Sequence, residues 1–181
     1  YEDIQLDVTE GENRGFPRFA SSAAHQTGSR YALSESFAAF GNGLTYAQMR
    51  YVLHFQVCRG INLINVMNIP SGNDGQLVGG LRPHFIEERP GAYDISEWNQ
   101  YAARLCYLMS CGVPEVKVLL YYPVRNFWMN PDSNGHEFTK AAEQLEDANV
   151  YFDISDDDLI LNADLEKLKE GKICAGYVEY D

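Results

Sequence analysis

Glu35 is the residue whose place in the sequence points most directly to chemistry. The apolar segment of residues 30–34 is typical of a short buried strand, and Glu35 follows it at once. Parallel α/β folds place their functional side chains at the carboxyl ends of strands. A carboxyl group there suits glycosidic cleavage, which needs two carboxyl groups that flank the bond. The alternative is a carboxylate that faces a helix or solvent and has no chemical role.

Four further polar residues are candidates for binding the substrate of such a site. Asn65 lies near the end of a second apolar segment, residues 61–67. The nearly continuous apolar character of this segment suits a strand of a parallel sheet. Asn68, Arg82 and His84 lie in or beside the long connection over residues 68–93. Long loops inside compact domains are usually functional, and these side chains can hydrogen-bond sugar hydroxyls. Ordinary loop chemistry without a ligand is the alternative.

The sequence predicts no metal site and no cofactor site. None of the four cysteines forms a CxxC pair, and the acids at 156–158 lack the spacing of an EF-hand loop. There is no phosphate loop or dinucleotide fingerprint. Ser21 and Ser22 precede His25, but a catalytic triad needs spatial partners that spacing does not reveal. We expect a structural role for His25 at the end of its helix.

The elements that must position these residues alternate between helix and strand. Gly28 is expected to end a first helix, and Thr45 with Gln48 forms a capping box at the start of the next. Such alternation implies parallel sheets. We predict strands over residues 30–34, 61–67, 116–122 and 150–154, and helices over residues 17–27, 45–59, 94–112 and 137–149, with a weaker helix near 163–169.

These elements predict an α/β chain in two parts. Residues 1–16 are expected to form an arm or linker, and residues 17–113 the C-terminal βα units of a (β/α) TIM barrel. Residues 114–181 are expected to begin an open parallel α/β domain of the flavodoxin or amidotransferase type. Two βα units cannot close an eight-stranded barrel, so we expect a fragment of a larger protein. Its exposed strand edges would favour self-association.

The charge of the chain narrows the classes of partner. The formal net charge is −12, and most of it lies in residues 137–181. An acidic surface repels phosphate backbones and anionic lipid, whereas it does not repel neutral sugars. The sequence therefore argues against nucleic acid and membrane as partners and leaves carbohydrate open. It does not indicate a compartment.

Several short motifs, in order, resemble one family of glycoside hydrolases, typified by the family 106 α-L-rhamnosidases. The resemblance covers most of residues 17–125. The matching segments are Ser21-Ser-Ala-Ala-His25, Leu33-Ser-Glu35-Ser-Phe37, Leu44-Thr-Tyr-Ala-Gln-Met49, Arg59-Gly-Ile-Asn-Leu63, Arg82-Pro-His84, Trp98-Asn-Gln-Tyr101, Ala103-Arg-Leu-Cys-Tyr-Leu108 and Val118-Leu-Leu-Tyr-Tyr-Pro123.

This resemblance implies a (β/α) barrel followed by an amidotransferase-like α/β domain without amidotransferase activity. It also implies that Glu35 is the general base of an inverting mechanism, with carboxyl groups ~6.5–9.5 Å apart. The partner acid would lie upstream of Tyr1, so this chain alone would lack activity. Calcium is associated with the family, but no ligands for it are identified in this chain. The stretch from Asn68 to Asn73 replaces an aromatic-rich segment, which leaves the sugar specificity open.

Two other functions stay open on the sequence. A non-catalytic carbohydrate-binding or scaffolding module fits the lack of a second matched acid. A flavodoxin-like domain that binds a small anionic cofactor is weaker, because the chain has no phosphate loop.

Overall fold

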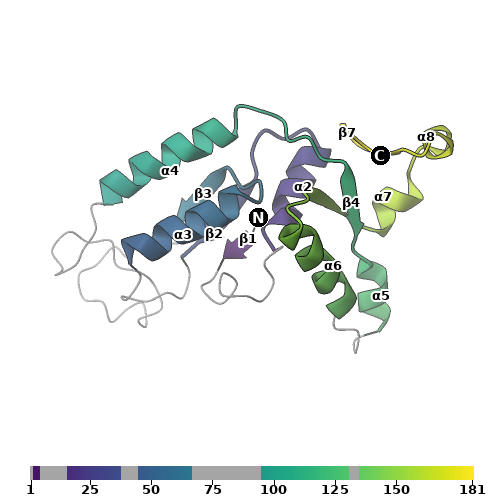
Figure 1. Ribbon diagram of the computed structural model, residues 1–181, viewed down its shortest axis with the longest axis horizontal. Coiled ribbons are helices and arrows are strands. Elements are labelled where there is room, and N and C mark those ends of the chain that lie inside the picture. The colour runs from purple at the N-terminus through teal and green to yellow at the C-terminus, as the bar shows by residue number, and fades with distance from the viewer. Residues whose placement is uncertain (1, 5–15, 38–44, 67–94, 131–134) are drawn as a thin grey trace.

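The computed structural model describes residues 2–4, 16–37, 45–66, 95–130 and 135–181. These residues form a mixed α/β structure with small parallel sheets, as the alternation of elements predicts (Figure 1). The elements in chain order are β1 (Glu2–Ile4), α2 (Arg18–Gln26), β2 (Leu33–Ser36), α3 (Tyr46–Val57), β3 (Leu63–Val66), α4 (Ile95–Met109), β4 (Val118–Tyr121), α5 (Val124–Met129), α6 (His136–Asp147), β5 (Phe152–Ser155), α7 (Asp157–Leu161), α8 (Leu165–Lys169), β6 (Ile173–Ala175) and β7 (Val178–Tyr180).

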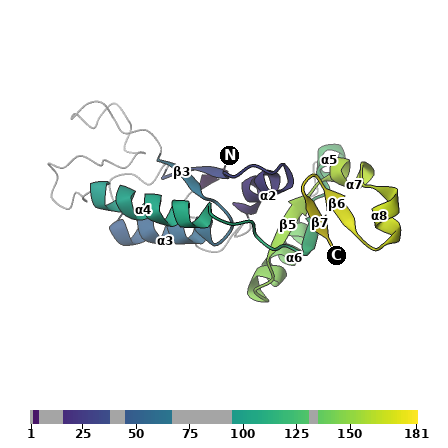
Figure 2. The same ribbon diagram turned by 90° about the horizontal axis from the view of Figure 1, so that it is seen from above.

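The first sheet contains β1, β2 and β3 in that order, and both pairs of neighbours are parallel. In its register, Glu35 is the Cα partner of Asp3 on one side and of Asn65 on the other. Helices α3 and α4 pack against each other on one side of the strands (Figure 2). The core between these helices and the sheet contains Phe37, Met49, Val52, Leu53, Val57, Trp98 and Ala102, with Ile64 and Val66 from β3 packed against it.

Strand β2 begins later than the sequence predicts and includes Glu35 instead of ending before it. The side chain of Asn62 forms hydrogen bonds with backbone groups of the residues just before the strand. Its amide oxygen accepts a hydrogen bond from the Ala32 N–H at 2.9 Å, and its amide nitrogen donates to the Arg30 carbonyl at 2.9 Å. Pairing between β2 and β3 therefore begins only at Leu33.

The two helices on this sheet follow their sequence signals closely. Both hydrogen bonds of the capping box between Thr45 and Gln48 are present at the start of α3. The apolar face of α4 is buried at Trp98, but at its far end Leu108 is 67% exposed. A 15-residue helix is ~22 Å long and a four-residue strand only ~13 Å. The last turn of α4 therefore extends beyond the sheet, which explains why its apolar residues there are exposed.

The second sheet is a parallel βαβ unit, as predicted. Strands β4 and β5 are parallel neighbours, and the chain between them forms α5 and α6. Phe152 and Ile154 of β5 are buried against Ala142 of α6. Phe19 of α2 also packs against this core, so the second sheet is covered partly by a helix that comes much earlier in the chain.

Five short elements are absent from the sequence prediction, namely β1, α5, α7, β6 and β7. β1 lies within the predicted arm of residues 1–16, and α5 lies within the loop predicted after residue 122. Helix α7 follows Asp156, whose carboxylate accepts a hydrogen bond from the Leu159 N–H at 3.0 Å and so caps the helix. Segments of three to six residues are too short for a helical or strand period to be recognised.

A C-terminal hairpin closes over α2. Strands β6 and β7 are antiparallel, and the N–H of Tyr177 in their turn donates to the Gln26 carbonyl at 3.1 Å. Gly176 has φ +57°, and a Cβ atom there would lie 2.0 Å from the Gln26 oxygen. Only glycine permits so close an approach. Helix α2 thus lies between the two parallel sheets and carries the hairpin at its end (Figures 1 and 2).

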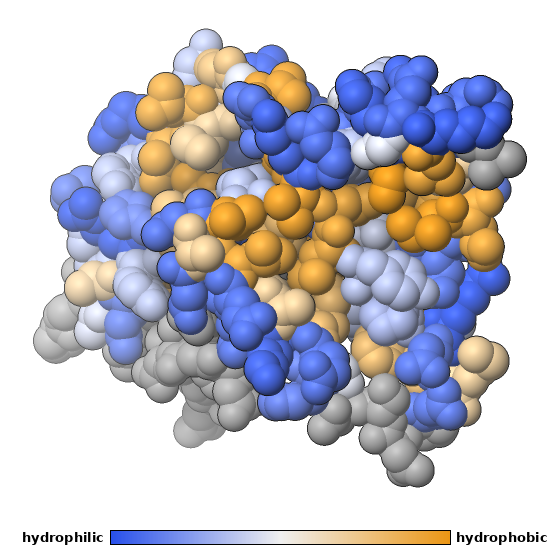
Figure 3. Space-filling view, turned by 45° about the vertical axis from the view of Figure 1, so that its right-hand side comes forward, coloured by the Kyte–Doolittle hydropathy of each residue, from blue (hydrophilic) through white to orange (hydrophobic). Residues whose placement is uncertain are grey.

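On the side of the molecule drawn in Figure 3, hydrophobic side chains gather in the middle and hydrophilic ones surround them. None of the helices in the described ranges combines the length and the apolar character that crossing a membrane requires.

Candidate functional site

Glu35 and Asn65 lie side by side near the carboxyl ends of two parallel strands. Each occupies the third position of a four-residue strand, and the two are register partners. Register partners in neighbouring strands share a face of the sheet, with their backbones ~4.8 Å apart. Glu35 is half-buried and Asn65 is exposed. The structure therefore brings a carboxyl group and an amide together at one edge of the sheet.

This pair lies on the face of the sheet opposite the helical core. Ser34 and Ser36 are buried and alternate with Glu35 along β2. On β3, Ile64 packs against the core of α3 and α4, whereas Leu63 on the other face is 44% exposed. Since side chains alternate between faces, Glu35 points away from the helices.

Phe37, directly after the strand, has an uncommon backbone conformation. It has φ +73°, a value that costs a bulky residue roughly 1–3 kcal/mol and persists only where the surroundings enforce it. Its ring is fully buried and meets Trp98 edge-on, with centroids 5.5 Å apart. Burial of this ring therefore turns the chain toward the helices two residues after Glu35. Strained backbone of this kind is frequent beside functional residues.

A buried polar network fixes the strand that carries Glu35. Gln56 of α3 is fully buried between the two serines that flank Glu35. Its amide oxygen accepts a hydrogen bond from the Ser34 hydroxyl, and its amide nitrogen donates to the Ser36 hydroxyl at 2.9 Å. Fully bonded networks of this kind rigidify a core. The sequence places Gln56 on the apolar face of its helix. A polar residue in that position was the signal that could have indicated a buried polar network.

The remaining predicted site residues lie elsewhere. Asn68, Arg82 and His84 fall outside the described residues, so Asn65 is the one predicted substrate-binding residue that the described part of the chain places beside Glu35. Within the described ranges, no group of three or more His, Cys, Asp or Glu side chains forms a candidate metal site. The four cysteines are free, and burial raises the pKa of the Cys106 thiol.

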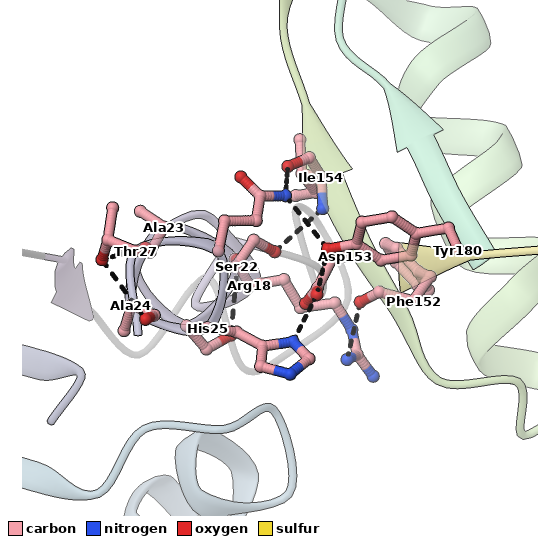
Figure 4. Close-up of polar contacts among 12 residues, drawn as sticks. Arg18, Ser22, Ala23, Ala24, His25, Thr27, Phe152, Asp153, Ile154 and Tyr180 are labelled. Carbon is pink, nitrogen blue, oxygen red and sulfur yellow. Dashed lines mark hydrogen bonds and ion pairs between the residues drawn. The ribbon is translucent and has the colours of Figure 1, made fainter. Parts of the chain in front are cut away.

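A second cluster of titratable groups, which sequence reasoning did not find, joins α2 to β5 and β7 (Figure 4). Asp153 is 2% exposed, and one of its carboxylate oxygens lies 2.6 Å from His25 Nδ1. The same oxygen accepts a hydrogen bond from the Tyr180 hydroxyl at 2.7 Å. Burial, together with this hydrogen bond, raises the pKa of Tyr180. Gln26 completes the cluster, since its amide donates to the Ile154 carbonyl at 2.9 Å.

Two arginines share one buried carboxylate beside this cluster. Glu146 of α6 lies 3.2 Å from Nε of Arg18 and 2.6 Å from a terminal nitrogen of Arg59. The Arg18 guanidinium also stacks over the rings of Tyr151 and Phe152, at 4.4 and 4.5 Å from their centroids. Burial raises the pKa of Tyr151. These contacts connect α2 and the segment directly after α3 to α6. Loss of one partner would be costly, because it would leave a buried charge unpaired.

The hydroxyl groups near His25 are engaged with the backbone. Ser22 accepts a hydrogen bond from the Ile154 N–H at 2.9 Å, and Ser21 donates to the Arg59 carbonyl at 2.6 Å. Neither serine hydroxyl is bonded to His25, as a catalytic triad would require. His25 is instead oriented by Asp153 in the contact between α2 and β5. This arrangement agrees with the structural role expected for it.

Comparison with protein-family models, with curated proteins and with solved structures gave no match for this chain. The geometry of Glu35 and Asn65 is therefore the basis for a functional argument, beside the resemblance seen in the sequence.

Proposed function

We propose that this chain is part of a glycoside hydrolase in which Glu35 is one of two catalytic carboxyl groups. The observation that carries the proposal is the position of Glu35 beside Asn65, near the carboxyl ends of parallel strands and on the face away from the helices. Active sites of (β/α) barrels occupy the carboxyl ends of their strands. The ordered motifs that resemble the family 106 α-L-rhamnosidases point to the same residue.

We further propose that the first sheet is a segment of a (β/α) barrel. In a barrel all helices lie on the outer face, whereas a doubly wound sheet has helices on both faces. Helices α3 and α4 both pack on one face of β2 and β3, which favours the barrel. The opposite face, with Glu35 and the exposed side chain of Leu63, would then line the interior. The second sheet would begin the amidotransferase-like domain.

In this proposal Glu35 removes a proton from the water that attacks the anomeric carbon. A second carboxylic acid gives its proton to the leaving oxygen, which matches the inverting arrangement. Asn65 can donate a hydrogen bond from its amide to Glu35 or to a sugar hydroxyl. Its exposed position next to Glu35 suits either role. An α-L-rhamnoside is the substrate that the resemblance favours.

The proposal is tested with the product of the complete reading frame, assayed on a panel of aryl glycosides that includes an aryl α-L-rhamnoside. Glu35→Gln keeps the size of the side chain and removes its capacity to act as a base. We expect kcat to fall by ~10²–10⁴-fold. The matched control is Glu115→Gln, the same change at an exposed residue.

Equal kcat values for wild type and Glu35→Gln would remove Glu35 from the mechanism. Glycan binding by a wild-type protein that turns over none of the substrates would favour the non-catalytic carbohydrate-binding module instead. Self-association through the edges of β1 and β3 stays a prediction, which analytical ultracentrifugation of the 181-residue chain would test.

A further inference from the structure

A cavity of about 370 Å³ opens at the carboxyl end of β4, between α5 and α6. Its volume lies near the lower end of the range for small-molecule sites, ~300–1,000 Å³. It therefore suits one ring better than an oligosaccharide. The cavity belongs to the second sheet and is separate from Glu35, which lies on the first.

Aromatic rings form the walls of this cavity. Phe127 of α5 and Phe138 of α6 both line it, together with Tyr121. Tyr122 holds the two phenylalanine rings in place, because it meets Phe127 edge-on at 5.0 Å and Phe138 edge-on at 4.8 Å between centroids. These contacts keep apolar ring surface available without a ligand, so the site is formed in advance.

Polar groups are also present in the lining. The amide of Asn126 and the carboxylate of Glu137 are both exposed. Gly135, the N-cap residue of α6, provides no side-chain cap for the N–H groups of the first turn of the helix. The amide oxygen of Asn126 already accepts a hydrogen bond from Asn130 at 2.6 Å. A ring with one apolar face and several hydroxyl groups could use both kinds of surface, because the Asn126 amide nitrogen donates hydrogen bonds and the Glu137 carboxylate accepts them.

The charges around the cavity disfavour an anion. Asp157 accepts a hydrogen bond from the Tyr121 hydroxyl at 2.6 Å, and this contact raises the pKa of Tyr121 and lowers that of Asp157. Arg125 does not provide a free positive charge, because its guanidinium is paired with Asp158. Glu137 adds a further negative charge. The uncapped first turn of α6 carries a partial positive charge of only ~0.5, so the full negative charges of Glu137 and Asp157 outweigh it and disfavour a phosphate group.

We propose that this cavity binds one neutral sugar ring, with its apolar face against Phe127 and Phe138 and its hydroxyl groups bonded to Asn126 and Glu137. The cavity, its aromatic walls and its acidic surroundings carry the inference. The choice of a carbohydrate over other neutral rings rests in part on the proposed function. The site would hold a sugar at a distance from the catalytic carboxyl group and add to the affinity for longer glycans.

The test is a titration of the 181-residue chain, labelled with ¹³C in its alanine methyl groups and observed by NMR. Ala141 lines the cavity, whereas its neighbour Ala142 is buried in the core of the second sheet and serves as an internal control. The probes are methyl α-L-rhamnopyranoside, methyl β-D-glucopyranoside and inorganic phosphate. We expect saturable shifts at Ala141 with at least one glycoside, smaller shifts at Ala142 and none with phosphate.

Two variants test whether the glycoside binds in this cavity. Binding to each variant is measured on the ligand by saturation-transfer NMR. Ala141→Phe fills the cavity and should weaken glycoside binding at least about tenfold. Asn126→Ala removes one hydrogen-bonding group at an exposed position and should weaken it about three- to tenfold. The matched control is Ala103→Phe at an exposed position on α4, which should leave binding unchanged.

No saturable shift at Ala141 with either glycoside would overturn the proposal, as would an equal response to phosphate. Unchanged binding in Asn126→Ala would overturn it even if Ala141→Phe failed to fold. Failure of this proposal can be distinguished from failure of the proposed function. If Glu35→Gln retained full activity while Ala141 still responded to a glycoside, the glycosidase mechanism would fail and the sugar site would stand.

Discussion

His25 Nδ1 and the carboxylate of Asp153 are in hydrogen-bonding contact although the two residues are 128 positions apart in the sequence. The contact connects α2, which precedes the strand of Glu35, to the central part of β5. It is one of several buried polar contacts between this helix and the second sheet. The position of the first sheet relative to the second therefore depends on side chains of α2, and changes in this contact should affect the whole chain.

Replacing Asp153 with alanine should destabilise the protein strongly. The substitution would leave the His25 ring nitrogen and the buried Tyr180 hydroxyl without their shared acceptor, with a cost of about 2–5 kcal/mol. Urea unfolding followed by circular dichroism measures the difference. Asp181→Ala is the matched control, because Asp181 forms only an exposed pair with Lys117, and its loss should cost about 0–1 kcal/mol. Similar losses in the two variants would contradict this account.

Tyr180 should make the protein sensitive to alkaline pH. Its pKa is raised in the folded state, so folded protein binds the phenolic proton more tightly than unfolded protein. The resulting stability is present below the ordinary tyrosine pKa of about 10 and is lost as the pH rises above it. Between about pH 8 and about pH 11, Tyr180→Phe should therefore lose less unfolding free energy than wild type.

The free energy of unfolding of each protein at the two pH values is obtained from the midpoint and slope of its urea unfolding curve. Lys167 and Lys172, whose pKa values are raised by Glu179, titrate in the same range, but their contribution is common to both proteins and cancels. Tyr107→Phe, at a residue that is 68% exposed, should behave like wild type. The explanation fails if Tyr180→Phe retains the pH dependence of the wild-type protein.

Gln56→Ala should destabilise the protein and also impair the proposed chemistry. It removes the hydrogen bonds from Gln56 to the buried Ser34 and Ser36 hydroxyls, which keep only their bond to each other at 3.1 Å, and it leaves a cavity, at a cost of about 2–4 kcal/mol. Gln48→Ala on the same helix loses only a capping contact and should cost about 1 kcal/mol. Thermal unfolding of the two variants tests whether Gln56→Ala loses more stability than Gln48→Ala. In the complete protein, Gln56→Ala should lower kcat more than Gln48→Ala does.

Gly176→Ala should detach the C-terminal hairpin from α2. A methyl group would meet the Gln26 carbonyl at 2.0 Å, and the backbone at φ +57° disfavours alanine. We expect a loss of at least about 1–2 kcal/mol and faster amide exchange in β6 and β7. Gly112→Ala meets nothing within 4 Å and should change the stability by less than about 0.5 kcal/mol. Equal amide exchange in the two variants would show that the close approach is unimportant.

Local sequence signals determined the order and type of the longer elements. The capping box at Thr45 set the start of α3, and the period of apolar residues in α4 placed Trp98 in the core. Alternation of helices and strands implied parallel sheets, which the structure confirms. These signals succeed because hydrogen bonds and apolar periods within one helix or strand depend on residues close together in the chain.

The tertiary structure alone decided how these elements meet. The pairing of His25 with Asp153, of Arg59 with Glu146 and of Gln56 with two serines joins residues far apart in the sequence, and no local period encodes such partners. Glu35 could be selected from the sequence because an acid follows an apolar segment. Its neighbour Asn65 and the face that they share follow from the register between strands, which is set only when the helices bury the opposite face of the sheet.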